Sequence, residues 1–327
     1  MNEELIVHGV ERTIKELFVY PNEFIYWSIQ IDMYPYMTGL VAGAFVLSSL
    51  YHFFGQKDLK EIAQFSLVFS LALLPVAALP LLLHLQQPLR AMNPLFTPHF
   101  TSAIAAFGIV FTIYGLIVLS EIWFVYRGYF VAQVDVLKGA GGFWNALRRI
   151  VYGALTIGAR DVSDEALKVD HKAAKVLAGV GIPVACFLHG YAGFIFGSVK
   201  ANALWMSPLM PVIFIMSAVV SGIALCMLTY IVIMEWQALR QRMKGGKAAA
   251  GEIKGAEHDI IAKAARYLLG FLIAAISLEL LDLIFRGYTA MKSWDILRSV
   301  MYGKDFINIF VLQYALGNLV PFVLLIL

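Results

Sequence analysis

Seven apolar blocks, each about twenty residues or longer, dominate this sequence of 327 residues. A helix needs about 20 apolar residues to cross the hydrocarbon core of a membrane, whereas a barrel strand needs about ten residues of alternating polarity. The blocks show no such alternation, so the sequence predicts an all-α protein, a polytopic bundle of transmembrane helices. The expected spans are residues 24–53, 62–85, 100–125, 176–196, 209–234, 267–285 and 306–327.

Composition excludes an ordinary soluble domain. Hydrophobic residues make up 60% of the chain and charged residues 14%, whereas soluble domains have about 45–50% and about 25%. The two cysteines, Cys186 and Cys226, both lie in apolar blocks, and the haem-attachment sequence C-x-x-C-H is absent. Because an iron–sulfur cluster needs about four ligands, we expect any redox centre to be bound non-covalently or to belong to a partner.

The basic residues predict the orientation. Seventeen of the 25 lie on one side of the expected membrane, at Lys57 and Lys60 and within residues 127–175 and 240–266, and eight lie on the other side. Cytoplasmic loops of membrane proteins carry an excess of Lys and Arg. We therefore expect these loops in the cytoplasm and the N-terminus outside. We expect the protein to lie in the lipid bilayer of the cytoplasmic (inner) membrane. We expect no nucleic-acid partner.

The segments that flank the spans also carry information. Residues 1–23 include five glutamates and no continuous apolar stretch, which argues against a cleaved signal peptide and favours an interfacial helix. Residues 143–157 are expected to form another, with Arg148 and Arg149 toward water. Glu121 and Glu235 are expected at cytoplasmic span ends, within reach of water. Since the last block has no polar flank, we expect the native chain to continue past residue 327.

Polar side chains inside the spans are candidates for function, because ionisable groups in hydrocarbon are costly. Gln30 and Tyr34 are four residues apart and share one helix face, whereas Asp32 points away from that face by roughly 200° at 3.6 residues per turn. With the predicted orientation, all the candidates fall in the outer half of the membrane. The others are His84, Arg90, His189, Tyr191, Glu279 and Asp282.

Each candidate also has a purely structural explanation. Asp282 and Arg286, four residues apart, are suited to an ion pair at a helix end. Tyr34 would fit the interfacial aromatic belt, and His84 would satisfy backbone carbonyls freed by nearby prolines. His189 would serve equally as a hydrogen-bond partner for a neighbouring helix.

Three functions remain open at this point. A His, a Tyr and an amide around an apolar cleft suit a quinone head, whose carbonyls need hydrogen-bond donors and whose reduced form needs proton acceptors. Glu279 and Asp282 would then carry protons outward. The same two carboxylates also suit an ion or solute transporter. A haem b cytochrome would use His84 and His189 as axial ligands.

Three segments of the sequence resemble the NrfD/PsrC family, the integral membrane subunits of polysulfide reductase-like respiratory complexes. The first is Trp27 followed by YPYMTGLVAGA at residues 34–44. The second is HLQQPLR at residues 84–90, continuing to PHFTS at residues 98–102, and the third is HGYAG at residues 189–193. The similarity is strongest to the larger, DsrP-like members of the family.

The resemblance implies a subunit that binds menaquinone non-covalently, without haem or an iron–sulfur cluster, and exchanges electrons with a periplasmic, ferredoxin-like iron–sulfur subunit. It also implies two four-helix bundles, here residues 24–196 with the quinone site and residues 197–327. By correspondence, Gln30, Tyr34 and Tyr191 hold the quinone head, with His84 and Arg90 from the outer segment. Gln30 and Tyr34 replace the Asn and His of polysulfide reductase itself, so Asp32 or His189 is expected to accept protons, with His189 the better placed.

Overall fold

The computed structural model describes residues 28–85, 88–98, 102–199, 204–243, 256–289, 292–303 and 306–327. Most of these residues are helical and none of them forms a strand, which confirms the all-α prediction. Seven of their helices are long and apolar enough to cross a membrane, in agreement with the seven predicted spans. The interfacial helix expected over residues 1–23 lies outside the described residues.

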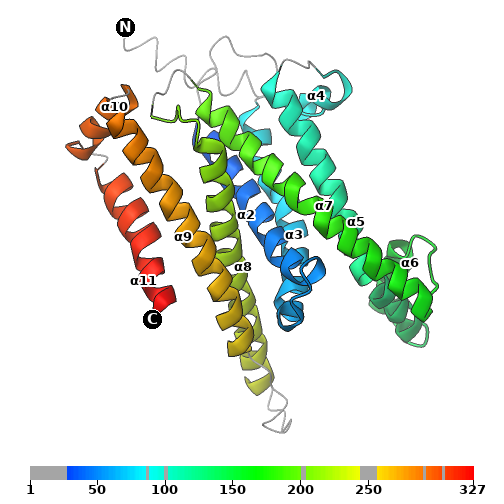
Figure 1. The fold of residues 1–327 in the computed structure, drawn as a ribbon. Coiled ribbons are helices and arrows are strands. Elements are labelled where there is room, and N and C mark those ends of the chain that lie inside the picture. Colours follow the sequence, from blue (N-terminus) through cyan, green and yellow to red (C-terminus); the bar gives the residue numbers. More distant parts are fainter. Residues whose placement is uncertain are drawn as a thin grey trace.

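The long helices run in alternating directions along one bundle (Figure 1). They are α2 (Ile29–His52), α3 (Lys60–His84), α5 (Ala103–Leu137), α7 (Asp164–Gly197), α8 (Met210–Met243), α9 (His258–Tyr288), and the π-helical η3 (Ile307–Leu319) continued by α11 (Val320–Ile326). The short elements η2 (Pro88–Arg90), α4 (Asn93–Phe96) and α10 (Lys292–Met301) lie at one end, here the α4 end. At the other, the α6 end, are η1 (Lys57–Leu59) and α6 (Phe143–Leu155).

Several helices extend well past their predicted spans at the α6 end. α7 begins at Asp164, twelve residues before the expected span, because the Ser163 hydroxyl accepts a hydrogen bond from the Ala166 amide and caps the helix. α8 likewise continues to Met243. Hydropathy identifies only the part of a helix that lies in hydrocarbon, so polar extensions into water escape it.

Two apolar clusters stabilise the bundle, and α2 contributes to both. The first joins α2, α3, α5 and α7 around the buried side chains of Phe45, Leu67, Tyr114 and Leu188. The second joins α2 and α3 to α8 and α9 around Leu47, Ile62, Ile223 and Leu268. A central α2 therefore links the two halves of the chain. The packing of these side chains fixes the position of α2 along its neighbouring helices, and therefore which residues lie beside each polar side chain of α2.

Small residues allow α2 and α8 to cross closely. Gly39 and Gly43 of α2 face Ala218 and Gly222 of α8, and a Cβ atom added at Gly43 would lie 2.2 Å from the carbonyl oxygen of Ala218. Small residues four apart bring helix backbones together in membranes, where packing replaces the hydrophobic effect. The crossing positions the half of α2 that carries the candidate residues against α8 as well as α7.

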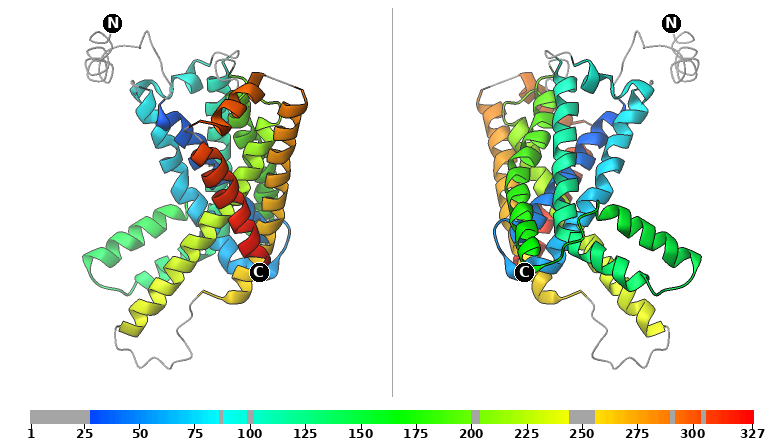
Figure 2. Two further views of the ribbon diagram at one scale, coloured as in Figure 1. Left: turned by 90° about the vertical axis from the view of Figure 1, so that its left-hand side faces the viewer. Right: turned by 90° about the vertical axis from the view of Figure 1, so that its right-hand side faces the viewer.

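The amphipathic helix predicted over residues 143–157 is present as α6. It projects from the side of the bundle at the α6 end (Figure 2). Phe143, Trp144 and Ile150 are exposed on it. The indole Nε1 of Trp123 in α5 donates to the Leu155 carbonyl at 2.9 Å, which fixes the last turn of α6 to the bundle.

Candidate functional site

A polar cluster forms where α2 begins, at the α4 end. Ser28 caps α2 by accepting a hydrogen bond from the backbone amide of Gln30 at 3.3 Å. The same hydroxyl donates to Gln30 Oε1 at 3.3 Å and lies 3.0 Å from Nδ1 of His84. Ser28, which the sequence did not single out, thus brings together two candidates from α2 and α3 that are 54 residues apart in the chain.

Tyr34 lies one turn deeper than Gln30 on the same face of α2 and is 6% exposed. Its ring meets Phe107 of α5 edge to face, with centroids 5.5 Å apart, and Phe196 of α7 at 6.4 Å. A tyrosine of the interfacial belt would lie at the protein surface. Tyr34 is instead inside the bundle, among rings from two other helices.

His189 lies between α2, α7 and α8 and is 5% exposed. Its imidazole packs against Gly39, where an added Cβ would lie 2.8 Å from Cε1, and its centroid is 5.6 Å from that of Phe214. A small cavity next to the ring is lined by residues of these three helices, among them Cys186 and Ala218. Nδ1 of His189 has no hydrogen-bond partner among the described residues. A buried polar atom without a partner is uncommon and calls for an explanation.

Tyr191 points to a different side of α7 from His189, as a separation of two residues on a helix requires. Its ring lies 5.8 Å from Phe187 and 5.5 Å from Phe194, and both phenylalanines are exposed on the outside of the bundle. Tyr191 is half-buried and also packs against the first apolar cluster, which contains Tyr34. The structure therefore places Tyr191 between the bundle interior and the lipid-facing surface.

Aromatic rings connect Tyr34 with His189. Phe196 contacts Tyr34 and lies 5.6 Å from Phe214, which in turn contacts His189 with the two rings tilted by 30°. Trp205 adds another ring, 5.3 Å from Phe196. Tyr34 and His189 thus border one aromatic region of α2, α5, α7 and α8 near the α4 end.

Two candidates lie apart from this region. Asp32 is exposed while Tyr34 is buried, so the two residues occupy different faces of α2, as their spacing predicted. Arg90 is exposed in η2. Neither residue contacts Tyr34 or His189 through an interaction found among the described residues.

The two carboxylates of α9 are both held by neighbours. Asp282 accepts a hydrogen bond from Arg286 Nε at 2.6 Å and another from the Ser207 hydroxyl, in the connection between α7 and α8. This pair is the i, i+4 ion pair considered from the sequence, and both of its side chains are buried. Glu279 accepts a hydrogen bond from Asn318 of η3 at 2.7 Å.

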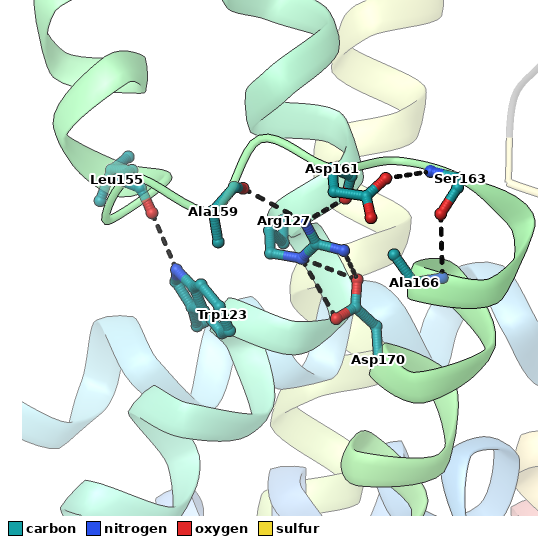
Figure 3. Close-up of polar contacts among 8 residues, drawn as sticks. All are labelled: Trp123, Arg127, Leu155, Ala159, Asp161, Ser163, Ala166 and Asp170. Carbon is teal, nitrogen blue, oxygen red and sulfur yellow. Dashed lines mark hydrogen bonds and ion pairs between the residues drawn. The ribbon is translucent and has the colours of Figure 1, made fainter.

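The sequence did not predict a buried ion pair that lies at the α6 end (Figure 3). Arg127 of α5 contacts Asp170 of α7 through Nε at 2.9 Å and through Nη2 at 2.7 Å. Nη1 of Arg127 also donates to the Ala159 carbonyl at 3.2 Å. The backbone amide of Ser163 donates to Asp161 and lowers the pKa of that carboxyl. In the sequence Arg127 is one basic loop residue among several, and no local motif distinguishes it from the others.

The expectation for Glu121 was wrong. Its side chain is fully buried in α5, and neither carboxyl oxygen has a hydrogen-bond partner among the described residues. α5 continues for sixteen residues beyond it, so Glu121 lies within the helix packing rather than at a span end. Glu235, by contrast, is exposed and accepts a hydrogen bond from the Ala256 amide, as expected for a residue that reaches water.

The fold and these buried polar groups define a multi-pass membrane protein with an aromatic and polar region near the α4 end of its first five long helices. Residues 20–327 match the family described as polysulphide reductase, NrfD. The chain belongs to this family, which confirms the resemblance found in the sequence.

Two curated relatives are reductase subunits. A selenate reductase subunit of Mesobacillus selenatarsenatis is 32% identical over 204 residues, which cover 62% of this chain and 47% of that protein. A putative dimethyl sulfoxide reductase membrane subunit of Halobacterium salinarum is 28% identical over 208 residues, which cover 63% and 43%. The chain thus spans about half the length of the curated relatives it matches.

Proposed function

We propose that this chain is the quinone-reactive membrane subunit of a respiratory reductase complex, and that it binds menaquinone near the α4 end. One observation carries the proposal. Tyr34 is buried among rings of α5 and α7, one turn below the Ser28, Gln30 and His84 cluster. Polar groups that converge at the edge of an apolar region, on helices that also face lipid, suit a head group with a long apolar tail.

The residues present fit a quinone. Its carbonyls need hydrogen-bond donors, and the hydroxyls of Tyr34 and Tyr191 supply them. When bound, menaquinone supplies a redox reaction that moves two electrons together with two protons. Nδ1 of His189, buried without a partner among the described residues, is suited to exchange a proton with the head group, because imidazole titrates near neutral pH. Tyr191, half-buried between Phe187 and Phe194, would lie where the tail leaves for the lipid.

The family and the relatives support a further subunit that receives or delivers the electrons. This chain has no set of four cysteines that would hold a cluster of its own. We infer that a periplasmic, ferredoxin-like iron–sulfur subunit docks at the α4 end, near the quinone.

The α6 end then faces the cytoplasm, in line with the excess of basic residues there. Single cysteines at Asn93 and Arg149 should react with membrane-impermeant reagents from opposite sides, and labelling of both from one side would contradict this orientation.

Geometry argues against a haem between His84 and His189. His84 contacts Ser28, at the start of α2, whereas His189 contacts Gly39. These positions are eleven residues apart, about 16 Å along the helix at 1.5 Å per residue. Two axial ligands of one iron must approach it from opposite faces of a single ring, so this separation is too large for them.

Contacts of α9 weaken the argument for a transporter. Asp282 is paired with Arg286, and Glu279 accepts a hydrogen bond from Asn318, so each carboxylate has a protein partner without a bound ion. Both carboxylates belong to the second half of the chain, residues 197–327. We propose that they serve there as an outward route for protons. The quinone site belongs to the first half, residues 24–196.

Removal of one hydroxyl tests the proposal. Tyr34→Phe keeps the buried ring, so the bundle should remain intact while menaquinone binding weakens by about 1 kcal/mol or more, the net value of one hydrogen bond. Tyr36→Phe is the matched control, because Tyr36 is 56% exposed two residues away. Binding is measured by titration of the purified protein with a soluble menaquinone analogue. Equal affinities of the two variants would contradict the proposed site.

A further inference from the structure

Polar atoms without partners gather among α2, α3, α5 and α7, here called the first bundle, in the half that lies toward the α6 end. Among the described residues, Oγ of Ser48, Nε2 of His52 and both carboxyl oxygens of Glu121 are buried and make no hydrogen bond. His52 is 5% exposed, and Ser48 and Glu121 are fully buried. An isolated charge or an unsatisfied polar group in an apolar interior costs several kcal/mol, so three such residues call for an explanation.

The helix register brings these residues to within about one turn of one another in depth. α2 and α5 run in the same direction, and the rings of Phe45 and Tyr114 meet at 5.6 Å. His52 and Glu121 each follow seven residues later, two turns further along their helices and on the same faces. Since both helices advance equally, His52 and Glu121 lie within about one turn of the same depth.

α7 refines this register. Gly181 of α7 contacts both Phe45 of α2 and Ile117 of α5, so these residues share one level. Ser48 and Glu121 lie about one turn beyond that level. α7 presents the small side chains of Ala174 and Ala178 over the next two turns, and both are buried. These small residues place no bulky apolar side chain of α7 beside the polar groups of α2 and α5.

Further hydroxyl groups extend this set of buried polar groups toward the α4 end. The Tyr114 hydroxyl donates to the Val41 carbonyl at 3.3 Å and lies 3.5 Å from the Ser70 hydroxyl of α3, which also donates to Val41. Tyr34 lies about two turns of α2 above Val41. A series of polar groups therefore runs inside the first bundle, from His52 and Glu121 past Tyr114 and Ser70 toward Tyr34.

We propose that Glu121 and His52 form a proton-carrying pair that connects the α6 end of the protein with the interior of the first bundle. In each transfer the O–H bond of the Glu121 carboxylic acid breaks and an N–H bond forms at Nε2 of His52, through intervening water, and no electron moves. The imidazolium then releases its proton toward the α6 end, and a proton from the other side restores Glu121. Transfer in the opposite direction uses the same bonds.

The surrounding titratable groups are few. His171 of α7 acts electrostatically on His52, and Tyr114 and Cys186 are the titratable neighbours on the interior side. α3 contributes the hydroxyls of Ser66 and Ser70, both buried. The Arg127 and Asp170 pair lies about 9 Å further along α5. Because this pair is mutually neutralised, it leaves the carboxyl of Glu121 without a fixed counter-charge.

Infrared spectroscopy of the complete protein in lipid tests the pair. A protonated carboxylic acid has a carbonyl band that shifts when its proton is replaced by deuterium. We expect such a band in the wild type and in Glu235→Gln, and its loss in Glu121→Gln. In D2O the wild-type band should shift, and His52→Gln should slow that shift by about 100-fold, the order of a lost acid–base partner.

Three results would overturn the proposal: no protonated band in the wild type, a band that does not exchange in D2O, or exchange at the wild-type rate in His52→Gln. The first two need no variant, so misfolding of a variant does not rescue the idea. The link from this pair to quinone turnover rests on the proposed function. The infrared measurement uses no quinone, so its failure is distinguishable from a failure of the quinone site.

Discussion

Arg127 of α5 and Asp170 of α7 form an ion pair buried at the α6 end, with Nη2 and Oδ2 2.7 Å apart and side-chain exposures of 4% and 10%. Removing one member of a buried pair leaves an uncompensated charge, which costs about 3–5 kcal/mol. We predict that Asp170→Ala lowers the stability of the purified protein by that amount. Asp135→Ala is the control, since its pair with Lys138 at the end of α5 is exposed and is worth about 0–1 kcal/mol. Equal losses in thermal unfolding would refute the difference.

The crossing of α2 and α8 should tolerate no side chain at Gly43. Because an added Cβ would lie 2.2 Å from the Ala218 carbonyl oxygen, Gly43→Ala must push the helices apart, at a cost of about 1–3 kcal/mol. Gly270→Ala is the matched control, because a Cβ there meets no other described atom within 4 Å. Thermal unfolding should therefore separate the two variants. A Gly43→Ala protein as stable as Gly270→Ala would show that the crossing is looser.

The exposed apolar face of α6 should lie in the lipid interface. Phe143, Leu147 and Ile150 are exposed at helical spacing, and Arg149 lies roughly 200° from Leu147 around the helix. An amphipathic helix of this kind lies in the plane of the membrane surface with its basic face toward water. Spin labels at positions 147 and 149 should differ, with the first more accessible to oxygen and the second to a water-soluble nickel complex. The same accessibility profile at both positions would argue against a membrane-bound α6.

Hydropathy was sufficient to predict the number of spans, because each apolar block is long enough to cross and no block alternates. It was insufficient for helix ends, where a hydroxyl cap such as Ser163 starts α7 in water. Hydropathy also could not predict which residues of different helices contact one another. Arg127 looked like one more basic loop residue until α7 placed Asp170 beside it, and Glu121 looked water-accessible until α5 proved to continue past it.

At the candidate site too, spacing along one helix could be predicted from the sequence, whereas contacts between helices could not. The spacing of Gln30, Asp32 and Tyr34 along one helix predicted correctly that Asp32 faces away from the other two. The helix period also places His189 and Tyr191 on different sides of α7, although they lie close in sequence. What no spacing reveals is the contact of His84 with Ser28, or the rings of Phe196 and Phe214 between Tyr34 and His189. These depend on which helices become neighbours.

His189 should matter more for quinone turnover than Asp32. His189 is buried, with Nδ1 unpaired among the described residues beside the aromatic region, whereas Asp32 is exposed on another face of α2. Loss of a positioned acid–base group costs about 10²–10⁴-fold in rate, so His189→Gln should lose at least the lower figure and Asp32→Asn far less. Quinone-dependent rates of the assembled complex across pH 6 to 9 measure both. A larger loss in Asp32→Asn would shift the proton-accepting role to that carboxyl.

Photo-crosslinking locates the bound quinone directly. A menaquinone analogue that carries a photoreactive group on its ring is bound to the complete complex in lipid, illuminated, and mapped by mass spectrometry of the peptides. We predict crosslinks on α2 and α7, within about a turn of Tyr34 and Tyr191, that excess menaquinone abolishes. Crosslinks confined to α9, η3 and α11, with α2 and α7 unlabelled, would contradict it.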